Sequence, residues 1–129
     1  MDYIGTKHEV KITVTEDVTA AAMHSGSLQV FSTPYMVALM EQASCELLQQ
    51  LLPEGITSVG TALDIQHLAA TAVGAPVRAV ATLTSFDGRK ATFDVEAYDN
   101  AGLIGKGSHE RFSIKVDKFL QKAQERAKV

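Results

Sequence analysis

The stretch TPYMVALMEQASCELLQQLLPEG, residues 33–55, decides the fold. It begins with Thr33 and Pro34, a pair typical of a helix start, with threonine as the N-cap and proline at the first helical position. Apolar side chains recur at helical spacing to about Leu52, and the proline and glycine of residues 53–55 end the helix. Further apolar residues cover much of its circumference, so we expect a helix buried on more than one side.

Most of the remaining chain alternates between apolar and polar residues with a period of two, which is typical of half-buried strands. We expect a short helical turn at residues 17–23 and a polar helix at residues 117–129, docked by Phe119 and Leu120. The expected strands are residues 8–15, 58–70, 76–86, 90–99 and 103–116. Hairpin signals such as Asp87-Gly88 make most of this sheet antiparallel.

A sheet of that length must cover its apolar face, and the long helix is the only candidate cover. We therefore predict an α+β fold in which an antiparallel sheet wraps around one long central helix. The length of 129 residues fits a single domain spanning residues 1–129.

Composition excludes several classes of function. Twelve Lys and Arg against 15 Asp and Glu give a net charge of −3, and the chain has no basic run, so we expect no nucleic-acid partner. Glu41 and Glu46 interrupt the most apolar stretch, so no membrane span is expected. A lone cysteine and the absence of a signal core predict a cytoplasmic protein. The four histidines are too scattered for a local metal motif.

Two titratable residues stand on predicted apolar faces. In TALDIQHLAATAVGAPV, residues 61–77, His67 shares a strand face with Leu63 and Ile65 if no bulge intervenes, and small residues follow it. Glu41 lies in the apolar helix. Burial raises the pKa of a carboxyl group and lowers that of an imidazole, which brings both toward the range of acid–base catalysis. Each residue alone also has a plain structural interpretation, as a packed histidine or a paired carboxylate.

The helix start adds a third candidate. Thr33 offers a hydroxyl, although as an N-cap it needs no further role. The amides of Tyr35 and Met36 point out of the positive end of the helix, where an oxyanion is favoured. Thr33 and Glu41 are eight residues apart, roughly 12 Å along a helix. Either the substrate spans them, or the helix start is distorted, or a second subunit completes the site.

Three segments resemble the fluoroacetyl-CoA thioesterase type of acyl-CoA thioesterase, which has the hotdog fold. They are FSTPYMVALMEQASC (31–45), SVGTALDIQHLAATAVGAPVRAVATL (58–83) and GKGSHERFSI (105–114). By motif position, the resemblance implies that Thr33, Glu41 and His67 form the catalytic set. It implies that Gly60 lies at the acyl end of the pocket and that Arg111 binds substrate.

The resemblance implies hydrolysis of an acyl-CoA to acid and CoA, without a metal or other cofactor beyond the CoA of the substrate. It also implies a homodimer, possibly paired into a tetramer, with sheets joined edge to edge and sites at the interface. The family's lid phenylalanine has no aromatic counterpart in AAMHSGSLQV (21–30), so we expect a general short-chain or unknown acyl group rather than selectivity for a fluorinated one. A non-catalytic acyl-CoA-binding protein and an enoyl-thioester hydratase remain alternatives.

The roles of individual groups stay partly open at this stage. Glu41 is expected either to activate water or to attack the carbonyl, with His67 orienting water or protonating the departing thiolate. Thr33 is expected to position substrate or water, because nothing in the sequence places a base beside it. Alternation along residues 103–116 puts His109 and Arg111 on a polar sheet face, from which Arg111 can still approach the substrate.

Overall fold

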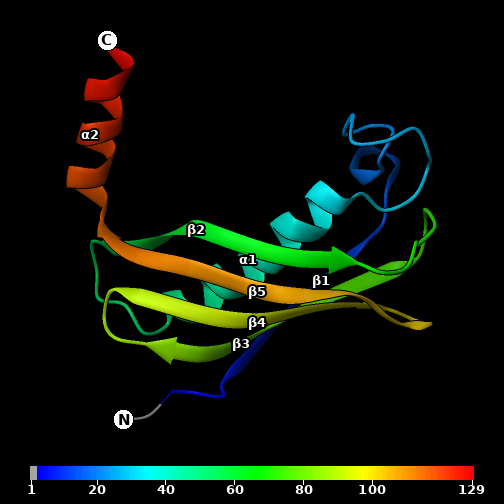
Figure 1. Ribbon diagram of the computed structural model, residues 1–129, viewed down its shortest axis with the longest axis horizontal. Coiled ribbons are helices and arrows are strands. Elements are labelled where there is room, and N and C mark those ends of the chain that lie inside the picture. Colours follow the sequence, from blue (N-terminus) through cyan, green and yellow to red (C-terminus); the bar gives the residue numbers. More distant parts are fainter. Residues whose placement is uncertain (1–2) are drawn as a thin grey trace.

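A computed structural model describes residues 3–129 of the chain, which form one curved sheet packed against a long helix (Figure 1). The sheet order is β1-β3-β4-β5-β2, and every neighbouring pair is antiparallel. The strands are β1 (Lys7–Thr13), β2 (Ile56–His67), β3 (Pro76–Phe86), β4 (Lys90–Asp99) and β5 (Gly102–Lys115). The helices are the single 3₁₀ turn η1 (Glu16–Val18), α1 (Thr33–Gln49) and α2 (Val116–Ala127).

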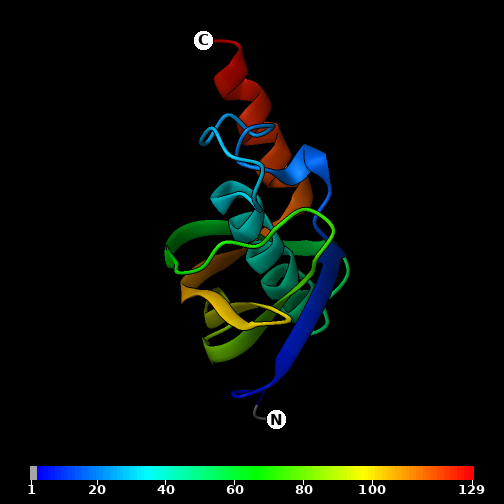
Figure 2. The same ribbon diagram turned by 90° about the vertical axis from the view of Figure 1, so that its right-hand side faces the viewer.

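Helix α1 lies in the concave side of the sheet (Figure 2). Its buried residues follow one stripe at helical spacing: Met36, Leu39, Met40, Ala43, Ser44, Leu47 and Leu48. Alternate residues of β3 and β4 face it, and many are alanines, such as Ala79 and Ala97, which let the helix approach the sheet closely. The predicted arrangement of a sheet wrapped around a central helix is confirmed.

Two expectations about the helices are wrong. Helix α1 buries one broad face only, because Ala38, Gln42 and Glu46 on the opposite face are exposed. It also ends at Gln49 rather than near Leu52, although Leu51 and Leu52 still pack against the core. Helix α2 buries none of its residues and stands away from the sheet (Figure 1), so Phe119 and Leu120 do not dock the tail.

Two glycines of β5 make room for neighbours on the helix side of the sheet. A Cβ at Gly105 would lie 2.5 Å from the sulfur of Met36, and a Cβ at Gly107 would lie 2.1 Å from the backbone oxygen of Asp64. The end of a methionine side chain can move, whereas a strand carbonyl held in the sheet cannot. The two positions therefore differ in how much bulk they tolerate.

We predict that Gly107→Ala lowers the free energy of unfolding by about 3 kcal/mol or more, at the upper end for overpacking. Gly105→Ala should lower it by about 1–2 kcal/mol, because Met36 can adopt another rotamer. Urea denaturation of the two variants beside the parent protein measures both values. Equal losses of unfolding free energy in the two variants would contradict this prediction, because they would show that the backbone at Asp64 moves as easily as the Met36 side chain.

Candidate active site

The start of helix α1 is capped by Ser32 instead of Thr33. The Ser32 hydroxyl accepts a hydrogen bond from the Tyr35 amide at 3.2 Å, and the Ser32 carbonyl accepts one from the Met36 amide at 3.0 Å. Serine is as good a cap as threonine, and the chain begins its helix one residue earlier than expected. Both amides expected to hold an oxyanion are therefore already engaged, and the Thr33 hydroxyl is free of capping.

The freed hydroxyl of Thr33 meets His67. Thr33 Oγ1 lies 2.7 Å from His67 Nδ1, so helix α1 and strand β2 are joined by this hydrogen bond at one end of the sheet. The expectation that no base lies beside Thr33 is thus wrong. The other ring nitrogen of His67, Nε2, is buried without a hydrogen-bond partner among the described residues. A buried polar atom without a partner marks a place where a ligand or water is needed.

The surroundings of His67 are partly apolar and partly open. Burial lowers the pKa of His67, and the backbone of Ala69 nearby partly opposes this shift. The ring of Phe31, itself almost fully buried, meets the imidazole edge-to-face at a centroid distance of 6.4 Å. Thr33 and His67 both line a recess of about 290 Å³, which Ala69 and Ala70 help to form. The imidazole thus has a pKa below its ordinary value and lies beside the recess.

Strand β2 carries a bulge that the sequence did not reveal. Its register with β5 shifts between Gly60 and Ala62, so Thr61 is the extra residue. The bulge precedes His67, and Leu63, Ile65 and His67 still share the half-buried face, as expected. The bulge also lets Gly60 face the helix, although it lies an odd number of residues from His67.

Glu41 lies against Gly60, away from His67. A Cβ placed on Gly60 would lie 2.8 Å from Glu41 Oε2 and 3.4 Å from Arg111 Nη1, so only glycine leaves this carboxylate where it is. Arg111 Nη1 is 3.9 Å from the same carboxylate oxygen. The Glu41 side chain is 42% exposed in the protomer, so the expectation of a carboxylate drawn out of water is wrong for the single chain.

Arg111 is buried and donates three hydrogen bonds. The expectation that His109 and Arg111 lie on a polar sheet face is therefore wrong, because both are buried. The guanidinium donates to Ser58 Oγ at 2.8 Å, to the Ser58 carbonyl at 3.0 Å and to His109 Nε2 at 3.2 Å. Ser58 and His109 are functional candidates that the sequence did not reveal. Ser58 shares a strand face with Gly60, and His109 shares one with Arg111, which is a signal available in the sequence. Only the pairing of β2 with β5 shows that these two faces meet.

The hydrogen bonds of His109 fix its tautomer. A guanidinium can only donate and a carbonyl can only accept. His109 therefore accepts from Arg111 at Nε2 and carries its proton on Nδ1, which lies 2.9 Å from the Ala62 carbonyl. Burial lowers the pKa of His109, and the charge of Arg111 lowers it further. The ring also stacks on Phe93 at a centroid distance of 6.0 Å.

The structure thus forms two groups from the predicted residues. Thr33 and His67 meet at one end of helix α1, and Glu41 meets Gly60 and Arg111 about two turns further along. The eight helical residues between Thr33 and Glu41 keep the groups roughly 12 Å apart. The seven steps of β2 from Gly60 to His67 separate them by roughly 20 Å along the strand. No single protomer unites all three predicted catalytic side chains.

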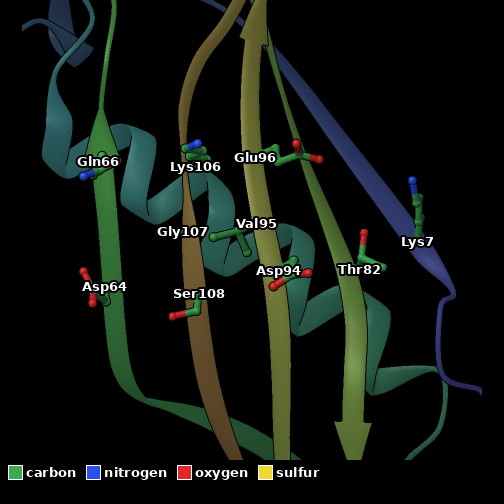
Figure 3. Close-up of a pocket in the computed structure, with 10 residues that line it drawn as sticks. All are labelled: Lys7, Asp64, Gln66, Thr82, Asp94, Val95, Glu96, Lys106, Gly107 and Ser108. Atoms are coloured by element: carbon green, nitrogen blue, oxygen red, sulfur yellow. The ribbon is translucent and has the colours of Figure 1, made fainter.

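A different hollow, of about 680 Å³, lies on the outer face of the sheet, away from α1 (Figure 3). Lys7 and Lys106 line it together with Asp64, Asp94 and Glu96, so its charges are mixed. Within residues 3–129, no group of three or more potential ligands is placed to hold a metal ion. No helix in that range has the length and apolarity to cross a membrane.

The lowered pKa values of His67 and His109 predict a loss of stability in mild acid. The pKa values of His67 and His109 lie below their ordinary value in the folded state, so the unfolded chain takes up protons first as the pH falls. Their contribution to stability is complete above pH about 6.5 and declines below it. We predict a lower free energy of unfolding at pH 5.5 than at pH 7.5, measured by urea denaturation at fixed protein concentration.

Two variants identify the source of that pH dependence. His109→Gln keeps an acceptor for Arg111 but cannot titrate, so the difference between the two pH values should shrink. His24→Asn, in an exposed turn, is the matched control and should leave the difference unchanged. An undiminished difference in His109→Gln would assign the effect to other groups.

Comparison with known proteins identifies the family of this chain. Residues 14–117 match the family model described as fluoroacetyl-CoA-specific thioesterase. The fluoroacetyl-CoA thioesterase of Streptantibioticus cattleyicolor is 40% identical over 98 residues, which cover 76% of this chain and 70% of that protein. A crystal structure of a mutant fluoroacetyl-CoA-specific thioesterase FlK superposes with a TM-score of 0.91 at 32% identity, covering 98% of each chain.

A second solved relative comes from Thermus thermophilus and is described as a thioesterase superfamily member. It superposes with a TM-score of 0.87 at 30% identity, covering 97% of this chain and 95% of its own. A structure described as a hot-dog-like protein, from Thermanaerovibrio acidaminovorans, gives a TM-score of 0.86 at 26% identity, covering 98% and 97%. The chain has the hotdog fold and belongs to the family of fluoroacetyl-CoA-specific thioesterases.

Proposed function

We propose that this thioesterase hydrolyses a short-chain acyl-CoA, and that Thr33, Glu41 and His67 carry the reaction. The observation that carries the proposal is the hydrogen bond between Thr33 and His67 beside a recess, with the second nitrogen of His67 buried and unpartnered in the described chain. Such a nitrogen is available to a water molecule or a leaving group. The small volume of the recess, about 290 Å³, favours a short acyl group.

We propose further that the protein is a homodimer in which each site draws on both subunits. Strand β2 pairs with β5 on one side and is an edge of the sheet on the other. An exposed edge of 12 residues is a ready template for a second copy. A twofold axis at Asp64 would set antiparallel β2 strands so that, with Thr61 as the extra residue of the bulge, Gly60 of one copy lies opposite His67 of the other. That pairing brings Glu41 of one copy to Thr33 and His67 of its partner.

In this dimer the chemistry divides between the two groups. The Gly60 amide, instead of the engaged amides of Tyr35 and Met36, holds the thioester oxygen, and Arg111 adds positive charge beside it. Glu41 takes a proton from the attacking water, or attacks the carbonyl itself to form a mixed anhydride that water then opens. His67 protonates the departing CoA thiolate through Nε2. Thr33 holds the imidazole at Nδ1 and so fixes the orientation of the ring.

We predict that Glu41→Gln and His67→Ala each lower the turnover of acetyl-CoA by at least about 100-fold, the scale of general acid–base catalysis. The assay follows free thiol release from a panel of acyl-CoAs. Glu46→Gln, on the exposed face of the same helix, is the matched control and should keep full activity. Normal turnover in both site variants would exclude these roles. Saturable binding without thiol release in the parent protein would identify a binding module.

Mixing the two inactive variants tests the shared site. A dimer of one Glu41→Gln chain and one His67→Ala chain keeps one intact pair of Glu41 and His67, but only if the two residues come from different subunits. Random exchange makes half of the dimers mixed, each with one of two sites intact, so about one quarter of the parent activity should return. Refolding the variants together and then measuring thiol release gives the result. Lack of recovery in mixtures shown to contain mixed dimers would place the whole site within one subunit.

A further inference from the structure

A further groove, of about 400 Å³, lies where strand β5 passes into helix α2. We refer to it as the α2 groove. Helix α2 rises from the same end of the sheet as the turn between β3 and β4 (Figure 1). Four cations line it, Arg89, Lys115, Lys118 and Lys122, together with Phe119 and Ile114. No acidic residue is among its lining residues.

The α2 groove is lined by positive charges, although the protein as a whole is negatively charged. The chain carries a net charge of −3, yet four of its 12 Lys and Arg residues line one groove. The three lysines make no direct ion pair with any acid in residues 3–129. The hollow on the outer face differs, because acids balance its lysines (Figure 3). Three lysines without an ion-pair partner in the described chain, beside an aromatic ring, suit an anionic ligand with a flat apolar part.

We infer that the α2 groove binds the phosphorylated adenosine end of the CoA substrate. The lysines and Arg89 contact its phosphates, and Phe119, which is 41% exposed, stacks on the adenine. This assignment rests on the proposed function for the identity of the ligand. It adds a site that neither the catalytic set nor the residues around Arg111 include.

The distance to the proposed reaction centre supports the assignment. Lys115 pairs with Ile56, and Arg111 pairs with Gly60, so the groove and the centre are four residues apart on both strands. Four strand residues span about 13 Å. The arm of CoA between sulfur and the first phosphate has roughly thirteen bonds and reaches about 15 Å if each bond extends as in a stretched polypeptide. One ligand can therefore occupy both places.

The direction of the side chains also agrees. Residues of β5 two apart share a face, so Lys115 stands on the same face as Ser113 and Arg111. On β2, Ile56 shares the face of Ser58 and Gly60. Ser113 and Lys115, which line the groove, therefore continue the row of side chains that leads from the proposed reaction centre, whereas Lys106 lines the hollow on the opposite face (Figure 3).

The test uses adenosine 3′,5′-bisphosphate as a probe, because its binding does not depend on hydrolysis. Calorimetry should show that Lys118→Gln with Lys122→Gln raises its Kd by about tenfold, the combined effect of two exposed charge contacts. The control, Lys7→Gln with Lys106→Gln, removes the same charge from the outer face and should change Kd less than twofold. Equal weakening by both pairs, or none by the first, would overturn the inference.

Kinetics and a second variant distinguish the sources of binding. With acetyl-CoA, Lys118→Gln with Lys122→Gln should raise KM about tenfold and leave kcat within twofold. With S-acetylpantetheine, which lacks the nucleotide, KM should not change. Phe119→Leu should weaken the bisphosphate several-fold but not inorganic phosphate; equal effects on both would exclude adenine stacking. If the parent hydrolyses no acyl-CoA yet binds the bisphosphate through these lysines, the groove stands and the proposed function fails.

Discussion

The packing of one stripe of helix α1 against the sheet is the constraint on which the other features depend. The stripe runs through Met36, Met40 and Leu47, so its burial fixes how the helix is rotated over the strands. Glu41 follows Met40 directly and is carried to the edge of the stripe, next to Gly60 of β2. Thr33, two turns earlier, reaches His67 at the other end of the same strand. The apolar contact therefore sets the positions of Thr33 and Glu41 relative to strand β2.

The same rotation explains why the polar groups are separate. A rigid helix cannot bring residues eight positions apart onto one small ligand, and strand β2 extends the separation further. In the proposed dimer, the twofold axis across β2 runs the partner strand in the opposite direction. The pair of Thr33 and His67 in one copy therefore lies beside the pair of Glu41 and Gly60 in the other. The glycine at position 60 and the bulge after it then have a common purpose. They allow a carboxylate and a guanidinium to approach the strand from the helix side at the point where the partner strand would arrive.

Sequence reasoning reached the architecture because its signals are local. The helix, the strands β3 and β4 and the hairpin between them follow from periodicity and turn residues within a few positions of each other. It placed Thr33, Glu41 and His67 as candidates because each stands out from its immediate neighbours. It mistook Thr33 for the cap, since both Ser32 and Thr33 are common cap residues and only the coordinates show which hydroxyl accepts from the Tyr35 amide.

The errors elsewhere arise from contacts between segments distant in sequence. The alternation of His109 and Arg111 with Glu110 and Phe112, on the same side as Lys115, predicts a polar sheet face. In the fold, Ser58 and Ala62 from the neighbouring strand accept their hydrogen bonds, and Phe93 stacks on the imidazole. A buried cation becomes tolerable only when such partners are present. Ser58, Ala62 and Phe93 all lie more than ten residues from Arg111 in the sequence, so local patterns around Arg111 do not indicate these partners.

The free edge of β2 has a consequence for the newly made protein. In the proposed dimer, a chain that has folded but met no second copy holds only part of each catalytic set. Hydrolysis would then begin only when the local amount of protein is high enough for two chains to find each other. Dilution would act as an off-switch that needs no inhibitor, and CoA thioesters would be safe from a solitary, freshly folded chain.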